Sequence, residues 1–280
     1  MQSSISEAHF KSFLIRHLKF RYALLACPVR ARTLEGGNLK HPFRSTNLLI
    51  LLTVAVANGA DFQVTLANCS EFIGIASVPI SRVQPLVPVT YHIAEGPPGL
   101  ASLVVRASLC RNGGSPIRVA QLGVVIISPD GSGDINNYTL SYSTDDSVLA
   151  FKLATTGWPV ALDPDLVYEV TPDPPGAGGT LFADQSPPLG PAGWFLSGTV
   201  TDPPPTPNFP FTANWWFKLH QGQIKMSTSI PLLNYGSGSV TVYTRRQSLL
   251  GGLIGGNTST FGTNLRGVFA DGTLSVKRLQ

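Results

Sequence analysis

Short runs of alternating apolar and polar residues follow one another from residue 61 to the C-terminus. A period of two residues is the pattern of β-strands that bury one face. Strands are predicted at residues 61–66, 73–78, 101–109, 119–128, 138–143, 166–170, 180–183, 194–201, 213–219, 223–229, 240–244, 266–269 and 273–276. Hairpins are predicted across residues 220–222 and across Asp271-Gly272, the second of which is a favoured hairpin turn. The pattern therefore favours a mostly β protein.

One region, residues 134–172, holds strand, helix and strand signals that follow each other without a gap. Its helix is predicted at Ser147–Thr155, with Thr144 or Asp145 as the N-cap. Gly157 follows as a candidate C-cap, because glycine readily adopts the left-handed conformation that ends many helices. This region is the strongest fold signal in the chain.

The composition agrees with many short strands. Glycine and proline are frequent, at 28 and 23 residues, and both favour tight turns. Hydrophobic residues make up 43% of the chain and charged residues only 13%, which is ample for a core. Residues 61–280 are expected to form a single mostly β domain. Within it, Leu249–Ile254 is either a helix turn or an apolar loop.

The N-terminal residues differ from the rest in charge. Residues 1–45 carry eight of the twenty Lys and Arg and two of the sixteen Asp and Glu, a net charge of +6. The remaining chain carries twelve basic and fourteen acidic residues, a net charge of −2. A basic face for nucleic acid is therefore not indicated in the body of the protein, and no nucleic-acid partner is expected.

Residues 46–60 are predicted to be the h-region and cleavage site of a secretory signal. Leu48–Val56 is apolar and uncharged, is too short to span a bilayer, and is followed by small residues such as Ala57 and Ala60. The basic segment before it, residues 1–45, is either a mispredicted start or a long n-region, or it is a real cytosolic segment followed by a weak anchor. The first reading predicts a secreted protein without a stable membrane span after cleavage.

A secreted chain can carry disulfides and glycans. Cys69 and Cys110 follow the predicted cleavage site and are expected to form one disulfide, the alternative being two buried free thiols. Three sequons make Asn68, Asn137 and Asn257 candidate glycosylation sites on surface loops.

Several short motifs follow one another in chain order: Leu86–Pro88, the strand region 100–109, Tyr138–Tyr142, Asp145-Asp146, the predicted helix and Gly157–Pro159. Together they resemble the motifs of the acetoacetate decarboxylase-like family. The resemblance covers roughly residues 80–200. It implies a large antiparallel β-barrel or cone-like single domain, with one or two short helices and an interior pocket.

The chain departs from this family where the resemblance requires a lysine pair, directly after the proline. One lysine forms a Schiff base, and its neighbour lowers its pKa so that the amine is neutral. Val160 and Ala161 stand at these positions, and neither can form a Schiff base. Lys152, on the predicted helix, is either a displaced nucleophile or a solvated helix lysine. Decarboxylation by the family mechanism is therefore not expected.

Three residues are candidate ligand-binding residues. Arg106 is the only charge in an apolar strand, and a charge that faces an interior needs a partner, for which Glu169 is a candidate. Trp158 is the third. If Arg106 faces solvent, nothing follows from it.

Trp215-Trp216 lie in a strand and face opposite sides, so the outward one is either a ligand platform or buried by a second layer.

No cofactor and no metal site are expected. His92 and His220 are far apart, and Asp130 and Asp134 are better explained as turn residues than as calcium ligands. The leading hypothesis is a secreted decarboxylase-like barrel that binds a small apolar or acidic ligand. One alternative is a secreted β-sandwich with a structural or adhesive role and no pocket, and another is an enzyme that uses Lys152. The oligomeric state is not predicted.

Overall fold

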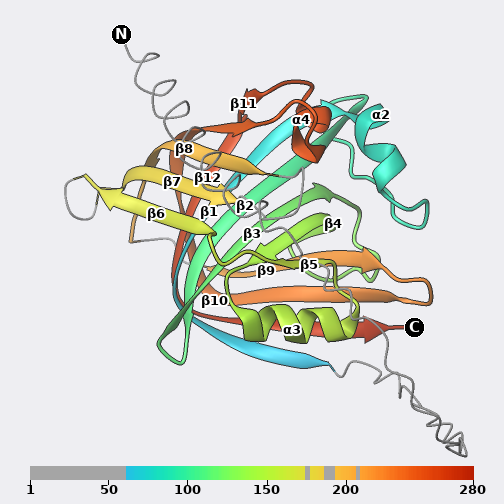
Figure 1. The fold of residues 1–280 in the computed structure, drawn as a ribbon, viewed down its shortest axis with the longest axis horizontal. Helices are drawn as coiled ribbons and strands as arrows, with labels where there is room; N and C mark the ends of the chain where they lie inside the picture. The colour runs from blue at the N-terminus through green and yellow to red at the C-terminus, as the bar shows by residue number, and fades with distance from the viewer. Residues whose placement is uncertain (1–60, 174–176, 186–192, 206–208) are drawn as a thin grey trace, which may run out of the picture. The chain divides into compact units, whose positions relative to one another are not determined.

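The computed structural model describes residues 61–173, 177–185, 193–205 and 209–280, in which twelve strands form one sheet (Figure 1). The strands are β1 (Phe62–Pro79), β2 (Leu100–Asn112), β3 (Ser115–Val125), β4 (Ile135–Thr144), β5 (Val160–Leu162), β6 (Val167–Pro172), β7 (Gly179–Gln185), β8 (Trp194–Thr201), β9 (Phe209–Lys218), β10 (Gln223–Thr244), β11 (Thr258–Thr260) and β12 (Thr263–Leu279). The helices are α2 (Ile80–Val83), the 3₁₀ turn η1 (Gln84–Leu86), α3 (Ser147–Thr156) and α4 (Leu249–Ile254). The predicted signal segment lies outside the described residues.

Seven of these strands close into a ring. Their order is β12-β1-β2-β3-β4-β9-β10, and β10 returns to pair with β12. The pairings are antiparallel except for β4 with β9, where Ile135 lies beside Ala213 and the two strands run parallel. The predicted barrel-like architecture is therefore correct. The alternative of two separate packed sheets is not the arrangement that these strands form.

Strand β10 is long enough to serve two parts of the sheet. Its first half pairs with β9 and β12 inside the ring, whereas Ser237–Thr244 pairs with β8. Strands β8, β7 and β6 then continue the sheet beyond the ring as an arm (Figure 1). Buried residues of the arm, such as Leu181 and Leu196, share one core cluster with Leu103 and Val105 of β2. The arm therefore covers part of the outer face of the ring, over β2.

Both faces of β2 are buried as a result. In β2, Leu103 and Val105 belong to the outer core, while Val104 and Cys110 belong to a second core inside the ring. Side chains alternate along a strand, so each face of β2 serves a different core. Arg106 belongs to the inner set and is 7% exposed.

Several strands are longer than the sequence pattern predicts. β1 joins the two strands predicted at 61–66 and 73–78, and β10 joins those predicted at 223–229 and 240–244. The hairpin predicted across Asp271-Gly272 is wrong. Asp271 and Gly272 pair with Ala67 and Leu66 in the middle of the ladder between β12 and β1. This pairing with β1, together with the pairing of the flanking parts of β12 with β10, keeps the chain extended and overrides the local turn signal.

Helix α3 forms where it was predicted, with a different N-cap. The Asp146 side chain accepts a hydrogen bond from the Leu149 backbone N–H at 2.6 Å. Asp145 instead forms an ion pair with Arg118 at 2.8 Å. Gly157 ends the helix in the left-handed conformation, with φ of 89°. Within the described residues, no helix is long and apolar enough to cross a membrane.

Candidate functional site: a cavity inside the ring

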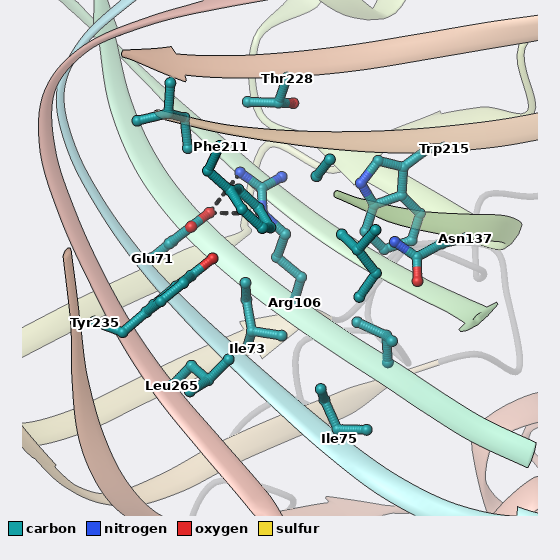
Figure 2. A pocket seen from close by; sticks show the side chains of 14 residues that line it. Glu71, Ile73, Ile75, Arg106, Asn137, Phe211, Trp215, Thr228, Tyr235 and Leu265 are labelled. Atoms are coloured by element: carbon teal, nitrogen blue, oxygen red, sulfur yellow. Dashed lines mark hydrogen bonds and ion pairs between the residues drawn. The ribbon is translucent and has the colours of Figure 1, made fainter. Parts of the chain in front are cut away.

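A cavity lies inside the ring of strands (Figure 2). It has about 500 Å³ of empty space, including the part that is open to solvent. Six of the seven ring strands contribute to its wall. The lining residues are Glu71, Ile73, Ile75, Val104, Arg106, Ile135, Asn137, Phe211, Ala213, Trp215, Thr228, Ile230, Tyr235 and Leu265. Most of them are apolar, which is typical of sites for small organic ligands.

The charged part of the wall is an ion pair between Arg106 and Glu71. Both Nε and Nη2 of Arg106 lie 2.8 Å from Oε2 of Glu71. The third donor group, Nη1, donates to Oε1 of Gln121 at 2.5 Å. The side chains of Arg106 and Glu71 are 9% and 3% exposed. A buried guanidinium is stable only when it is neutralised and hydrogen-bonded, and these two partners supply both conditions.

The pairing of strands brings these residues together. Ile73 of β1 lies directly opposite Arg106 of β2, so Glu71 is the diagonal neighbour on the same face. Gln121 of β3 lies directly opposite Arg106 on its other side. On the far side of β1, Gly267 is the cross-strand partner of Glu71. A Cβ at Gly267 would lie only 2.9 Å from Oε1 of Glu71, so glycine provides room for the carboxylate.

The prediction that Arg106 faces an interior agrees with its position, but Glu169 is not its partner. Glu169 is exposed on β6, which belongs to the arm outside the ring. Glu71 was missed because it lies between the two strands predicted at 61–66 and 73–78. Its sequence signal is an isolated acid before the apolar run Phe72–Ile75. Only the merging of both predicted strands into β1 places that acid on the inner face.

Aromatic side chains form another part of the wall. Trp215 and Trp216 face opposite sides of β9, as alternation predicts, and both are buried. Trp215 lines the cavity, whereas Trp216 lies in the outer core and donates its Nε1–H to Asn136 at 2.8 Å. The outward tryptophan is thus covered by a second layer and offers no ligand platform. Nε1 of Trp215 is buried and has no hydrogen-bond partner among the described residues.

Two neutral polar side chains reach the cavity. Tyr235 lies on the same side as Glu71 in Figure 2, and Asn137 lies on the other side, next to Trp215. Burial raises the pKa of Tyr235 far above its ordinary value, and the negative charge of Glu71 raises it further, while Arg106 opposes the shift. Oδ1 of Asn137 is buried without a hydrogen-bond partner among the described residues.

The glycosylation site predicted at Asn137 is therefore incompatible with this fold. Its side chain lies on the cavity wall and the residue is 2% exposed, so a glycan has no path to solvent. Asn68 and Asn257 are exposed and sterically accessible. Cys69 and Cys110 are bonded to each other, as predicted. Their disulfide belongs to the inner core and joins β1 to β2.

The turn at residues 129–133 is stabilised by protein donors. Asp130 accepts a hydrogen bond from Lys225 at 2.6 Å, and Asp134 accepts one from the Thr212 backbone N–H at 2.6 Å. These contacts occupy the carboxylates that were considered as calcium ligands. No group of three or more His, Cys, Asp or Glu side chains that could hold a metal occurs in the described part of the chain.

Comparisons with known proteins agree with the ring architecture. No family model and no curated protein matches the sequence. A solved structure of acetoacetate decarboxylase is similar, with a TM-score of 0.52 and 10% identity over 78% of this chain and 89% of that one. The chain resembles acetoacetate decarboxylase in its fold. The acetoacetate decarboxylase of Legionella pneumophila has a TM-score of 0.50 and 11% identity over 78% of this chain and 87% of that one.

This likeness to acetoacetate decarboxylase concerns the fold alone, so the site must be judged from its own residues. Val160 and Ala161 lie in β5, which pairs with β4, and neither lines the cavity. Lys152 is exposed on α3, with its Nζ 5.9 Å from the ring centre of Phe62. Trp158 is buried against Tyr142 and Phe217 and does not line the cavity. Of the predicted ligand-binding residues, only Arg106 belongs to the cavity wall.

Proposed function

We propose that this protein binds a small ligand inside a decarboxylase-like barrel and lacks the Schiff-base nucleophile of that family. The observation that carries the proposal is the composition of the cavity wall. Fourteen described residues line the cavity, and none of them is a lysine. A cavity that keeps a buried ion pair and apolar walls, but holds no amine, suits ligand binding better than Schiff-base chemistry.

The position of Lys152 supports the loss of this chemistry. A Schiff-base lysine must be neutral at the moment of attack, which requires desolvation or a neighbouring cation. Lys152 is exposed on α3. The ring of Phe62 near its Nζ favours the charged form, because the aromatic face attracts cations. Lys152 therefore lacks both the environment and the access to the cavity that a displaced nucleophile would need.

A cavity-blocking variant tests ligand binding. Ala213 lines the cavity, so Ala213→Phe would place an aromatic ring in the space that a ligand would occupy. The full chain would be screened by ligand-observed NMR against small aromatic and aliphatic molecules. We expect binders whose signals are lost in Ala213→Phe and kept in Ala154→Phe, a matched control at an exposed position of α3. No binder in a folded protein, or equal binding to both variants, would contradict the proposal.

Reductive trapping tests the missing nucleophile. The full chain would be incubated with acetoacetate and sodium borohydride, which fixes any Schiff base as a stable amine, and its peptides would be analysed by mass spectrometry. We expect no labelled lysine above the level of a lysozyme control. A specific adduct at Lys152 would instead establish the enzyme alternative.

We also propose that the protein is secreted. The apolar stretch Leu48–Val56 and the Cys69–Cys110 disulfide support this, because disulfides persist in oxidising compartments. Mass spectrometry of protein from the medium of expressing cells would locate the N-terminus and any glycans at Asn68 and Asn257. Retention of the full chain inside the cell would refute secretion and leave the ligand-binding proposal intact.

A further inference from the structure

We propose that the cavity selects an uncharged, largely apolar alcohol or phenol, whose hydroxyl group binds between the Glu71 carboxylate and the Tyr235 hydroxyl. This inference rests on the proposed ligand-binding function and goes beyond it, because the sequence left an acidic ligand equally open. Three features of the wall support it: the neutralised arginine, the unused acceptor and donor near one another, and the apolar surroundings.

The first feature is the state of Arg106. A ligand carboxylate is recognised by a guanidinium whose charge is not already neutralised by a protein carboxylate. Here Nε and Nη2 of Arg106 both point at Glu71, and Nη1 donates to Gln121. Arg106 and Glu71 are the charged residues among the fourteen that line the cavity, and their charges cancel. An anion would find no unpaired cation there and would be repelled by Glu71.

The second feature is a pair of unused polar groups. Arg106 engages Oε2 of Glu71, while Oε1 receives no hydrogen bond from the described residues. The hydroxyl of Tyr235 likewise has no hydrogen-bond partner among them, and Figure 2 shows it directed toward the Glu71 side of the cavity. A ligand hydroxyl can donate to a carboxylate and accept from a phenol at once, which a ketone, ether or hydrocarbon cannot do.

The tyrosine remains a donor at physiological pH. Burial raises the pKa of its hydroxyl and the Glu71 charge raises it further, so Tyr235 stays protonated. Most of the rest of the wall is apolar, and Ile73, Leu265 and Phe211 are drawn closest to Glu71 and Tyr235 in the view of Figure 2. A ligand therefore gains from an apolar body, while one hydroxyl satisfies both polar groups.

Three probes with one carbon skeleton separate the possibilities in isothermal titration calorimetry of the full chain at pH 7. 4-Ethylphenol carries the hydroxyl and is neutral, because phenols ionise near pH 10. 4-Ethylanisole has the hydroxyl hydrogen replaced by methyl, and 4-ethylbenzoate is an anion. We expect the affinity for 4-ethylphenol to be at least about tenfold higher than the affinity for either of the other two probes. Tighter or equal binding of the benzoate would overturn the inference while supporting ligand binding.

Equal affinity for the anisole and the phenol would also overturn it, because the hydroxyl would then have no role. If no small molecule of any kind binds, in calorimetry or in the NMR screen, both the inference and the proposed function fail. If other small molecules bind in the NMR screen but no alcohol or phenol does, only the inference fails.

Two variants locate the hydroxyl. Tyr235→Phe keeps the ion pair and removes the donor, so it should weaken 4-ethylphenol about three- to tenfold and leave 4-ethylanisole unchanged. Tyr243→Phe is the matched control, because Tyr243 stacks on Phe195 of the arm, away from the cavity wall. Equal effects of the two variants would contradict the placement of the hydroxyl.

Glu71→Gln should reverse the selectivity. It leaves Arg106 charged without an acid partner, so 4-ethylbenzoate should bind about tenfold more tightly than it does to the native protein. A folded Glu71→Gln protein that still rejects the benzoate would contradict the role given to Glu71. If this variant does not fold, the Tyr235→Phe result decides the question by itself.

Discussion

Two buried arginines, one on each face of the ring, have different surroundings. Arg106 faces inward, and each of its three side-chain nitrogens contacts Glu71 or Gln121. Arg266 faces outward, donates to Ser70 and Tyr168, and lies 3.3 Å from Asp202, whose side chain is 31% exposed. The inner arginine is neutralised by a buried carboxylate, whereas the outer arginine contacts two hydroxyl groups and a carboxylate that is partly exposed to solvent.

The difference separates a structural role from a ligand-facing one. Arg266 joins β12 to Tyr168 of the arm, so its contacts connect the ring to β6. The contacts of Arg106 join adjacent strands that are already paired, and therefore add little connection. What they add is a polar group on the wall of an apolar cavity. The two arginines can be distinguished by how much each loss destabilises the protein and by whether it changes ligand binding.

The largest effect is expected for Arg106→Met. It leaves Glu71 charged and buried without a partner, which destabilises a fold by about 3–5 kcal/mol. Urea unfolding followed by circular dichroism would measure the loss. The double variant Arg106→Met with Glu71→Leu should recover much of the stability, because it removes both charges. A double variant no more stable than the single one would show that the charge pair is not the cause.

Overpacking should distinguish the two cores. Ala107 lies in the outer core and is 2% exposed, so Ala107→Phe should destabilise by about 1–3 kcal/mol or more. Ala213→Phe places its phenyl group in the cavity, where there is space for it. This variant should therefore lose less than about 1 kcal/mol of unfolding free energy. Thermal unfolding of both variants gives the comparison. Equal destabilisation by Ala107→Phe and Ala213→Phe would mean that the cavity closes in solution.

Arg266→Met should have an intermediate effect of roughly 1–3 kcal/mol. Asp202 can be solvated after the change, and Ser70 and Tyr168 remain hydrogen-bonded to each other at 3.1 Å. Unlike changes to the inner pair, it should leave the affinity for 4-ethylphenol unchanged. Calorimetry on the folded variant would check this, and a lost affinity would mean that the arm shapes the cavity.

The smallest effect concerns pH and the turn that Asp130 stabilises. Burial raises the pKa of Asp130, but hydrogen bonds from Lys225 and Ser132 outweigh burial and lower the pKa from 3.8 to about 2. The stabilisation is therefore present above pH 3.8 and is lost as the pH falls toward about 2. The Asp130 side chain is 36% exposed, so solvent screening keeps the contribution under about 1 kcal/mol.

Lys225→Met should remove most of this dependence. Unfolding free energies measured between pH 5 and pH 2.5 would decline less steeply in the variant than in the native protein. An identical slope in both proteins would show that other carboxylates control acid stability.

Much of the fold could be predicted because its signals are local. Alternation located β2, β4 and β8 closely, and Asp146 and Gly157 enclose a helix only one residue longer than expected. The failures arise where distant strands impose the conformation. Asp271-Gly272 has the sequence of a turn, but its pairing with β1, and the pairing of the flanking parts of β12 with β10, keep it in a strand.

The candidate site divides in the same way. An isolated arginine in an apolar strand was visible in the sequence, and so was the absence of a lysine after Pro159. The sequence could not reject Glu169 as the partner of Arg106, and it could not identify Glu71 and Tyr235 as cavity residues. No local pattern shows which strands are neighbours in the sheet. Asn137 was predicted to be a glycosylation site on the surface for the same reason: the ring that encloses its side chain forms from distant strands.

The sequence by itself determined the strands, the helix with its glycine end, and the residues available for chemistry. These depend on backbone preferences and side-chain alternation within a few neighbouring positions. Only the tertiary structure decided that β10 closes the ring against β12, and hence that Glu71, Arg106 and Tyr235 share one cavity. Ring closure depends on pairing between residues far apart in the chain, and its register sets which side chains face inward.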